Sequence, residues 1–249
     1  MKCTISRGLK FCIGFYCKSY RQLRFLRSSC TSSACSLQNN MNWEQMWSAN
    51  GGLKPGQAFD ATKPLPFLAK VFEMGMVPKG RGIVPGCGRG YAVRALSKGG
   101  RSVLGVDVSK TACHAAKSFV PAQGETDGCG PCEYMHGSFF DLNSNDVGGQ
   151  FDFAYDYTFL CALDPSMRTE WAATYARLLK TEGKLFTAVF PIGERSGGPP
   201  YAMTVDLIES LLSPHGFKKT FEKQLGENEA HENRYNGPMN TTFCVWSRS

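Results

Sequence analysis

The sequence predicts an α/β fold in which a mostly parallel β-sheet is covered by helices on both faces. Three observations predict it. Short apolar segments alternate with segments of helical spacing along residues 81–212. A glycine-rich turn at residues 86–90 joins the first predicted strand to the first predicted helix. An acidic residue, Asp107, ends the second strand about 20 residues further on, as in nucleotide-binding sheets.

The expected strands are β-branched or aromatic runs, and the expected helices carry apolar residues at helical spacing. In chain order they are strand 81–85, helix 91–98, strand 102–108, helix 109–120, strands 133–140 and 151–158, helix 165–180, strand 184–191, helix 205–212 and a terminal strand pair, 217–225 and 241–247. Gly99 ends the first helix, and Ser109 is a suitable N-cap for the second. Residues 43–72, before the first strand, are expected to be mostly helical.

The positive charge of the chain is concentrated in its first 40 residues. The 249-residue chain has 28 Lys and Arg against 21 Asp and Glu. Residues 1–40 hold seven basic residues and no acidic one, so residues 41–249 carry 21 of each sign. A nucleic-acid-binding domain needs a surplus of Lys and Arg on its folded surface, so no nucleic-acid partner is expected. No run of about 18 apolar residues occurs, so no integral membrane segment is expected either.

Residues 1–40 are expected to be a transit peptide or a disordered leader, and residues 41–249 a single domain. Arg- and Ser-rich, acid-poor leaders are typical of organellar transit peptides. A mitochondrial address is favoured over a plastid one, and initiation at Met41 would give a cytoplasmic form. A secretory signal is the rival interpretation, but its apolar stretch at residues 11–17 is short and basic residues follow it closely.

The glycine-rich turn indicates a site for an adenosyl ligand. Glycines allow the backbone to turn sharply and approach a ligand, and Asp107 is placed to accept hydrogen bonds from both ribose hydroxyls. A dinucleotide site spaces its glycines as G-x-G-x-x-G. Here the third glycine, Gly90, comes one residue early and Tyr91 fills its usual place. This spacing favours a ligand without a pyrophosphate, and S-adenosylmethionine is such a ligand.

Two further strand ends supply candidate site residues. Ser138 and Phe139 follow the third strand, where Ser138 is a candidate to bond an adenine edge and Phe139 to pack on the ring. A core position for Phe139 remains an equal alternative. Asp156 and Tyr157 end the fourth strand, so both are expected to face the methyl donor.

The chain resembles the thiopurine S-methyltransferase superfamily, and within it the thiol and halide methyltransferases called harmless-to-ozone-layer proteins. The matching segments span residues 43–201. They are Trp-Glu-Gln-Met-Trp at 43–47, Val-Pro-Gly-Cys-Gly-Arg-Gly-Tyr at 84–91, Gly-Val-Asp-Val-Ser at 105–109, Phe-Asp-Phe-Ala-Tyr-Asp-Tyr-Thr-Phe at 151–159, Phe-Pro-Ile at 190–192 and Gly-Gly-Pro-Pro-Tyr at 197–201. The string at 84–91 and the Asp-Tyr-Thr-Phe string at 156–159 are specific, whereas the string at 105–109 is generic.

The resemblance implies a Rossmann-like, S-adenosylmethionine-dependent methyltransferase with a seven-stranded sheet and an antiparallel last strand. It also implies a helical N-terminal lid. The donor-binding residues that it implies are Trp43, Trp47, Gly86, Gly88, Asp107, Ser138 and Phe139. Cys87, inside the glycine turn, and Asp156, at the end of the fourth strand, are added as donor-binding candidates from their positions in the chain. Tyr157 matches the aromatic residue beside the acceptor, and with Asp156 it forms the predicted catalytic pair. The pair Cys129 and Cys132 and the basic leader are departures from the family pattern.

The implied reaction is a direct in-line displacement onto a small-molecule acceptor, either a sulfur nucleophile (thiol, bisulfide, thiocyanate or small thioether acid) or a halide. Asp156 or Asp164 is a candidate to take a thiol proton, but a halide or thioether has none to lose. For Asp156 the alternative is that it anchors the strand end, because acids there often bond backbone groups. Two alternatives remain open: a dinucleotide-dependent oxidoreductase on the same core, and a non-catalytic S-adenosylmethionine-binding module. No metal site is expected, because Cys129 and Cys132 lack a second pair of ligands. The sequence does not indicate an oligomeric state.

Overall fold

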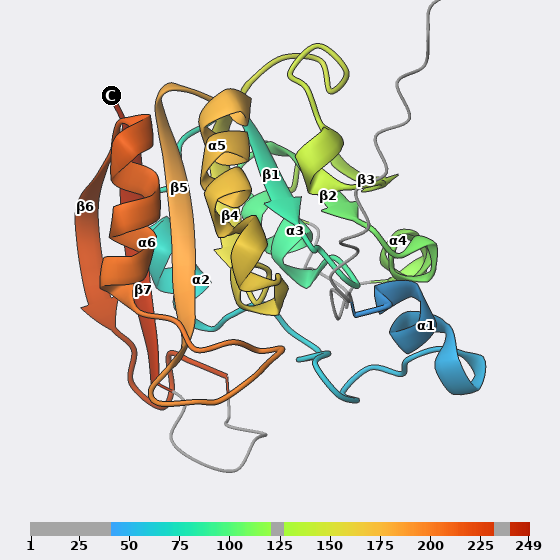
Figure 1. Cartoon of the computed structure of the whole chain (residues 1–249). Helices are drawn as coiled ribbons and strands as arrows, with labels where there is room; N and C mark the ends of the chain where they lie inside the picture. Colours follow the sequence, from blue (N-terminus) through green and yellow to red (C-terminus); the bar gives the residue numbers. More distant parts are fainter. Residues whose placement is uncertain (1–40, 121–126, 232–239) are drawn as a thin grey trace, which may run out of the picture. The chain divides into compact units, whose positions relative to one another are not determined.

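The computed structural model describes residues 41–120, 127–231 and 240–249 (Figure 1). The contacts divide the chain into two units, Met1–Gln38 and Asn39–Ser249, and everything described belongs to the second. The predicted leader, residues 1–40, lies outside the described residues, so its role stays a prediction. Within the described part, no helix is both long enough and apolar enough to cross a membrane.

A seven-stranded sheet with the order β3-β2-β1-β4-β5-β7-β6 forms the centre of the Asn39–Ser249 unit (Figure 1). Its strands are β1 Arg81–Pro85, β2 Ser102–Asp107, β3 Cys132–His136, β4 Phe151–Tyr157, β5 Leu179–Ile192, β6 Phe217–Gln224 and β7 Asn240–Arg248. Neighbouring strands from β3 through β5 are parallel, whereas β7 runs antiparallel to both β5 and β6. The predicted α/β fold with an antiparallel last strand is therefore confirmed.

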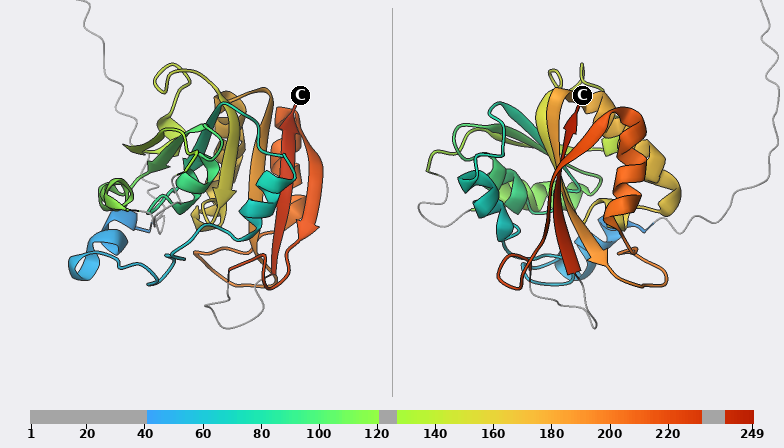
Figure 2. Two further views of the ribbon diagram at one scale, coloured as in Figure 1. Left: turned by 180° about the vertical axis from the view of Figure 1, so that it is seen from behind. Right: turned by 90° about the vertical axis from the view of Figure 1, so that its left-hand side faces the viewer.

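Helices cover both faces of the sheet, with α5 and α6 on one side and α2 and α3 on the other (Figure 2). The helices are α1 Trp43–Ser48, α2 Phe67–Glu73, α3 Tyr91–Leu96, α4 Lys110–Ser118, α5 Arg168–Leu178 and α6 Val205–Leu212. Trp171 of α5 and Leu212 of α6 are fully buried in one apolar cluster, and Val71 of α2 and Val93 of α3 in the other. Burying a large apolar side chain contributes roughly 1.5–3 kcal/mol, so these two clusters hold the helices on the sheet.

Three predicted elements differ from the structure. Residues 43–72 are helical only in α1, in a short 3₁₀ turn at Ala49–Gly51 and in α2, because the segment between them contains several Gly and Pro residues. The third strand ends at His136 rather than at residue 140, because Ser138 caps the 3₁₀ turn Phe139–Asp141. Strand β5 begins at Leu179, where the prediction placed the end of a helix.

The strand order places a ligand-binding crevice next to β1. Strand β1 pairs with β2 on one side and with β4 on the other, so the order of strands reverses between β1 and β4. In open α/β sheets, ligands bind outside the carboxyl ends of the strands at such a reversal. The glycine-rich turn after β1 lies at this edge.

Candidate functional site

A cavity of about 720 Å³ lies at the carboxyl ends of β1, β2 and β4. Its size is within the usual range for small-molecule sites. The wall is formed by the turn after β1, the end of β2, the segment after β3, the end of β4 and residues 41–65. All of the predicted site residues line it except Asp156.

The glycines of the turn after β1 are required by close contacts. Gly88 has a φ of +51°, and a Cβ there would lie 3.2 Å from a ring carbon of Trp47. Gly90 has a φ of +80° and precedes α3, and a Cβ there would lie 2.6 Å from the ring of Tyr134. Only glycine fits both the left-handed backbone and the space at these positions. The third glycine is therefore explained by the start of α3, and the turn approaches the cavity closely.

Asp107 is fixed at the end of β2 by two backbone groups. Its Oδ2 accepts a hydrogen bond from the Gly88 N–H at 2.9 Å, and its Oδ1 accepts one from the Ser109 N–H at 2.9 Å. Each carboxylate oxygen has a second lone pair, so both remain able to accept a ribose hydroxyl. Burial raises the pKa of Asp107, which is 7% exposed. The geometry fits the predicted role of Asp107 as the ribose acid, which remains a prediction.

Residues 43–62, which are predicted to form an N-terminal lid and are called the lid below, pack their aromatic side chains together beside the turn. The ring of Phe59 lies 5.6 Å from the ring of Trp43 and 5.6 Å from that of Trp47, with edge-on geometry in both pairs. Helix α1 of the lid is attached to α4 by Glu44, whose carboxylate accepts hydrogen bonds from the Ser109 hydroxyl and the Thr111 hydroxyl and N–H. These bonds lower the pKa of Glu44 to about 2. The lid is thereby held against the donor side of the cavity.

The predicted adenine contacts lie on the cavity wall. Ser138 lines the cavity, and its Oγ accepts a hydrogen bond from the Phe140 N–H at 3.2 Å, which leaves its own proton to donate. Phe139 is 3% exposed and contacts Tyr175 in the core, so it borders the cavity with little of its ring. Val108, directly after Asp107, is 54% exposed and lines the same wall. We regard Val108 as a better candidate than Phe139 for covering an adenine face.

The opposite end of the cavity is aromatic. Tyr157 lies 5.9 Å from Phe190 in an edge-on pair and 5.7 Å from the ring of His231 in a stacked pair. All three side chains line the cavity. Thr158, the next residue along the chain, has a φ of +64°, which is strained for a β-branched residue. Strained residues cluster at functional sites, and this one holds the chain turn beside Tyr157.

Asp156 is held at the end of β4 by several hydrogen-bond donors. Its carboxylate accepts hydrogen bonds from Trp171 Nε1 at 2.7 Å, from the Tyr175 hydroxyl at 3.0 Å and from the Leu160 N–H at 3.1 Å. The Phe159 backbone is a further partner, so donors occupy the carboxylate on all sides. Asp156 is 4% exposed and does not line the cavity. This geometry argues against the predicted catalytic and donor-binding roles of Asp156 and supports a role in attaching the end of β4 to α5.

Cys87 is the predicted site cysteine, and its thiol is buried beside β2. The Sγ of Cys87 packs closely against Gly105, since a Cβ on Gly105 would lie only 2.9 Å from it. Burial raises the pKa of the Cys87 thiol well above its usual value. Cys87 therefore borders the cavity as a small residue rather than as a nucleophile. Neither Cys129 nor Cys132 lines the cavity. Among the described residues, no three His, Cys, Asp or Glu side chains are grouped to hold a metal ion.

Several cavity residues escaped the sequence-based predictions. Phe59 lies in a Gly- and Pro-rich segment with no periodicity, and His231 lies in a polar stretch that reads as a surface loop. Only long-range packing brings them to the cavity, so no local signal identifies them. Val108 directly follows Asp107, the predicted ribose-binding residue. This position in the sequence is the one local signal that indicates Val108 as a cavity residue.

Comparisons with known proteins agree with this geometry. A family model described as thiopurine S-methyltransferase matches residues 38–246. A probable thiol methyltransferase 2 of Arabidopsis thaliana is 41% identical over 177 residues, which are 71% of this chain and 73% of that protein. Thiocyanate methyltransferase 1 of Brassica oleracea is 35% identical over 180 residues, with the same shares of both chains.

Solved structures show the same fold. A SAM-dependent methyltransferase from Methanosarcina mazei superposes with a TM-score of 0.58 at 18% identity, covering 71% of this chain and 96% of that one. Magnesium protoporphyrin IX methyltransferase from Synechocystis, solved with bound SAM, has a TM-score of 0.55 at 19% identity, with 73% and 76% covered. At these identities the similarity concerns the architecture alone.

Proposed function

Because the chain belongs to the thiopurine S-methyltransferase family, whose methyl donor is S-adenosylmethionine, we propose that its acceptor is a small sulfur nucleophile or a halide. The sulfur nucleophiles in question are a thiol, bisulfide, thiocyanate or a small thioether acid. The observation that carries the proposal is the acceptor end of the cavity, which is aromatic and, among the described residues, offers no carboxylate placed as a general base. Such a site suits a nucleophile that attacks through a lone pair without losing a proton in the same step.

Each carboxylate that lines the described part of the cavity already has partners. Asp60 forms an ion pair with Arg89 at 2.8 Å, and Asp107 is held by two backbone N–H groups of the donor side. Asp164 accepts hydrogen bonds from the Ser166 N–H at 2.9 Å and from its hydroxyl at 2.6 Å, and these bonds lower its pKa. A low pKa makes Asp164 a weak base at neutral pH. An acceptor that is already an anion, or a neutral thioether, reacts without a general base.

The residues of the cavity fit the donor. Asp107 would hold the ribose, the backbone at Gly86 and Gly88 approaches closely enough to hold the methionine part, and Ser138 is placed for the adenine edge. When bound, the donor supplies an electrophilic methyl group on a sulfonium. Aromatic faces attract such a cation, and Trp43 and Trp47 of the lid are the candidates. The main contribution of the chain is to place donor and acceptor in line and to keep water out, which is a large effect in displacement reactions.

The names of the relatives support a sulfur acceptor. The Arabidopsis thaliana relative is called a probable thiol methyltransferase, and the Brassica oleracea relative a thiocyanate methyltransferase. Thiocyanate and thiolates are soft anions with weakly held water. The positive edges of aromatic rings suit such anions, and Tyr157 and Phe190 form an edge-on pair at the acceptor end. The dinucleotide-dependent oxidoreductase is not retained as an alternative, because the family match identifies a methyltransferase.

A labelled-methyl transfer assay tests the proposal. The purified protein is incubated with methyl-labelled S-adenosylmethionine and, separately, with thiocyanate, bisulfide, iodide, small organic thiols and a small thioether acid. We expect labelled product from at least one of these and none from amine or catechol controls. Calorimetry with S-adenosylmethionine is run in parallel. Donor binding without transfer to any acceptor would contradict the proposal and favour a non-catalytic binding module.

A further inference from the structure

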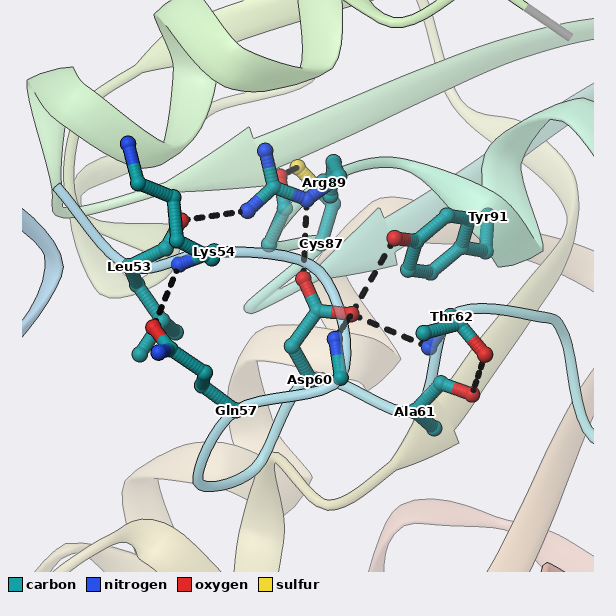
Figure 3. Close-up of polar contacts among 11 residues, drawn as sticks. Leu53, Lys54, Gln57, Asp60, Ala61, Thr62, Cys87, Arg89 and Tyr91 are labelled. Atoms are coloured by element: carbon teal, nitrogen blue, oxygen red, sulfur yellow. Dashed lines mark hydrogen bonds and ion pairs between the residues drawn. The ribbon is translucent and has the colours of Figure 1, made fainter.

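Arg89 occupies an unusual position, because it lies inside the glycine-rich turn yet its side chain reaches the N-terminal lid. Its guanidinium Nε donates to Asp60 Oδ2 at 2.8 Å, and its Nη2 donates to the Leu53 carbonyl at 2.7 Å (Figure 3). Both contacts are to residues of the lid, residues 43–62. The ion pair is well shielded from water, with the side chain of Arg89 11% exposed and that of Asp60 1% exposed.

Asp60 accepts hydrogen bonds both from the lid and from the segment that contains the glycine-rich turn and the start of α3. Figure 3 shows it between Arg89 and Tyr91. Its Oδ1 accepts a hydrogen bond from the Tyr91 hydroxyl at 3.1 Å and one from the Thr62 N–H at 3.0 Å. Burial and the nearby Asp60 carboxylate raise the pKa of Tyr91 to about 12, so its hydroxyl remains a donor at neutral pH. Tyr91 is the first residue of α3, so Asp60 is tied to the glycine-rich turn at two points.

The same guanidinium contacts the predicted donor cover. The guanidinium carbon of Arg89 lies 5.5 Å from the centre of the Trp47 ring, within the range of a cation–π interaction. Trp47 also lies against Gly88, where a Cβ would be 3.2 Å from it. One side chain thus joins the donor-binding turn, the irregular part of the lid and a lid tryptophan.

We infer that Asp60, Arg89 and Tyr91 form a latch that fastens the lid to the donor-binding turn, with Arg89 as the positioning residue for Trp47. Glu44 attaches the other half of the lid, helix α1, to α4. Glu44 and Asp60 thus fasten the lid near its two ends. The latch therefore controls how long the lid retains the donor. The inference depends on the donor, which the family establishes, and is independent of the acceptor proposed above.

The expected effect is on donor dissociation. Asp60→Asn removes the ion pair at almost unchanged size, and Tyr91→Phe removes one hydroxyl. A hydrogen bond to a charged group is worth enough to change an equilibrium by roughly 10- to 100-fold, so we expect Asp60→Asn to weaken S-adenosylmethionine binding within that range. Tyr91→Phe should weaken it by about 3- to 10-fold, since one bond is lost and the ion pair remains. Arg89→Lys keeps the charge but not both donor directions, so it should fall between wild type and Arg89→Ala.

The decisive measurement is the dissociation rate of S-adenosylmethionine, followed by tryptophan fluorescence after rapid mixing. We expect dissociation to accelerate in Asp60→Asn and Arg89→Ala. In the double variant, S-adenosylmethionine should dissociate about as fast as in the faster of the two single variants, because both substitutions break the same contact. Lys180→Ala is the matched control, because it removes an ion pair of 2.7 Å with Asp152 at the opposite end of the sheet. It should leave dissociation unchanged.

Three results would overturn the inference. If Arg89 instead bound the donor carboxylate directly, Asp60→Asn would free the guanidinium and tighten donor binding while Arg89→Ala weakened it. If the cluster only stabilised the fold, the melting temperature would fall while the folded variants kept the wild-type dissociation rate. Unchanged dissociation in both Tyr91→Phe and Asp60→Asn would likewise exclude a latch. A changed acceptor profile with unchanged donor binding would bear on the proposed function and not on the latch.

Discussion

The two ends of the cavity are built in different ways. The predicted donor end is made largely by two short segments, the turn after β1 with Gly86 and Gly88 and the end of β2 with Asp107. The Gly88 and Ser109 N–H groups donate to the Asp107 carboxylate and fix it. The acceptor end is made by Tyr157, Phe190 and His231, which come from three distant segments and meet through ring contacts. The donor end is defined by backbone geometry, whereas the acceptor end is defined by side-chain packing.

This difference explains why one fold can serve several acceptors. The backbone of the donor end tolerates few substitutions, because a side chain at Gly88 or Gly90 meets another ring. The side chains of the acceptor end can be exchanged without altering the sheet beneath them. The donor is therefore expected to be constant and the acceptor variable, and the predictions below separate the two ends.

The largest effect is expected for Asp107→Ala. The substitution removes the predicted acceptor of two ribose hydroxyls, which also accepts from the Gly88 and Ser109 N–H groups. Two hydrogen bonds to a charged group are worth enough to lower donor affinity by about 100-fold or more. Calorimetry with S-adenosylmethionine measures the loss, and Asp107→Asn, which keeps one accepting oxygen, should lose less. An unchanged donor affinity would show that another residue binds the ribose, and the donor end of the cavity would then not be the end that contains Asp107.

Lowering the pH should reproduce part of the loss of donor affinity expected for Asp107→Ala. The ionised carboxylate of Asp107 is the form that accepts the ribose hydroxyls, so donor affinity is present above its pKa and falls as the pH drops through it. Burial raises this pKa, so the fall should occur at a higher pH than for an ordinary aspartate. Donor titrations between pH 4 and 8 provide the measurement. Asp107→Asn should show a flat profile, and an unaltered slope in that variant would assign the titration to another group.

Asp156→Asn should affect stability rather than chemistry. Trp171 and Tyr175 both donate to the Asp156 carboxylate, and an amide would present its own N–H to at least one donor. We expect a loss on the order of 2 kcal/mol, which corresponds to roughly 4–8 °C in the melting temperature. Thermal unfolding measures the loss. If Asp156 were the general base, kcat would instead fall by a factor on the order of 100 to 10,000 in protein that is still folded.

Tyr157→Phe should change the acceptor profile more than donor affinity. The ring contacts with Phe190 and His231 survive the loss of the hydroxyl, so the fold should be retained. We expect the ratio of kcat/KM between two acceptors, for example thiocyanate and iodide, to shift by up to about tenfold, the worth of one hydrogen bond. The donor dissociation constant should stay within about twofold. A change in donor affinity with a constant acceptor ratio would show that the two ends are not separate.

The same difference determined what the sequence could predict. Strands β1, β2 and β4 and the glycine turn are marked by local patterns, because apolar runs, glycine spacing and a terminal acid lie close together in the chain. The irregular segment between α1 and α2 could not be predicted, because the positions of Phe59 and Asp60 depend on long-range contacts with Trp47 and Arg89 as well as on local turns. For Asp156 the local pattern identifies the strand end but not the direction of the side chain. Asp156 ends a strand at the ligand edge, but its side chain turns to Trp171 in the core.

The smallest effect is expected for Ser138→Ala, which tests whether a side chain of the donor end contributes to donor binding. Ser138 lies on the donor wall, but it contributes a side-chain hydroxyl rather than backbone. A hydrogen bond between uncharged groups changes affinity by about 2- to 10-fold, so donor binding should weaken to that extent while the ratio between acceptors stays constant. Ser210→Ala is the matched control, because its hydroxyl bonds only the Leu207 carbonyl within α6. If Ser138→Ala behaved like Ser210→Ala, the adenine would be held by Val108 and backbone alone, and the donor end would be a backbone site throughout.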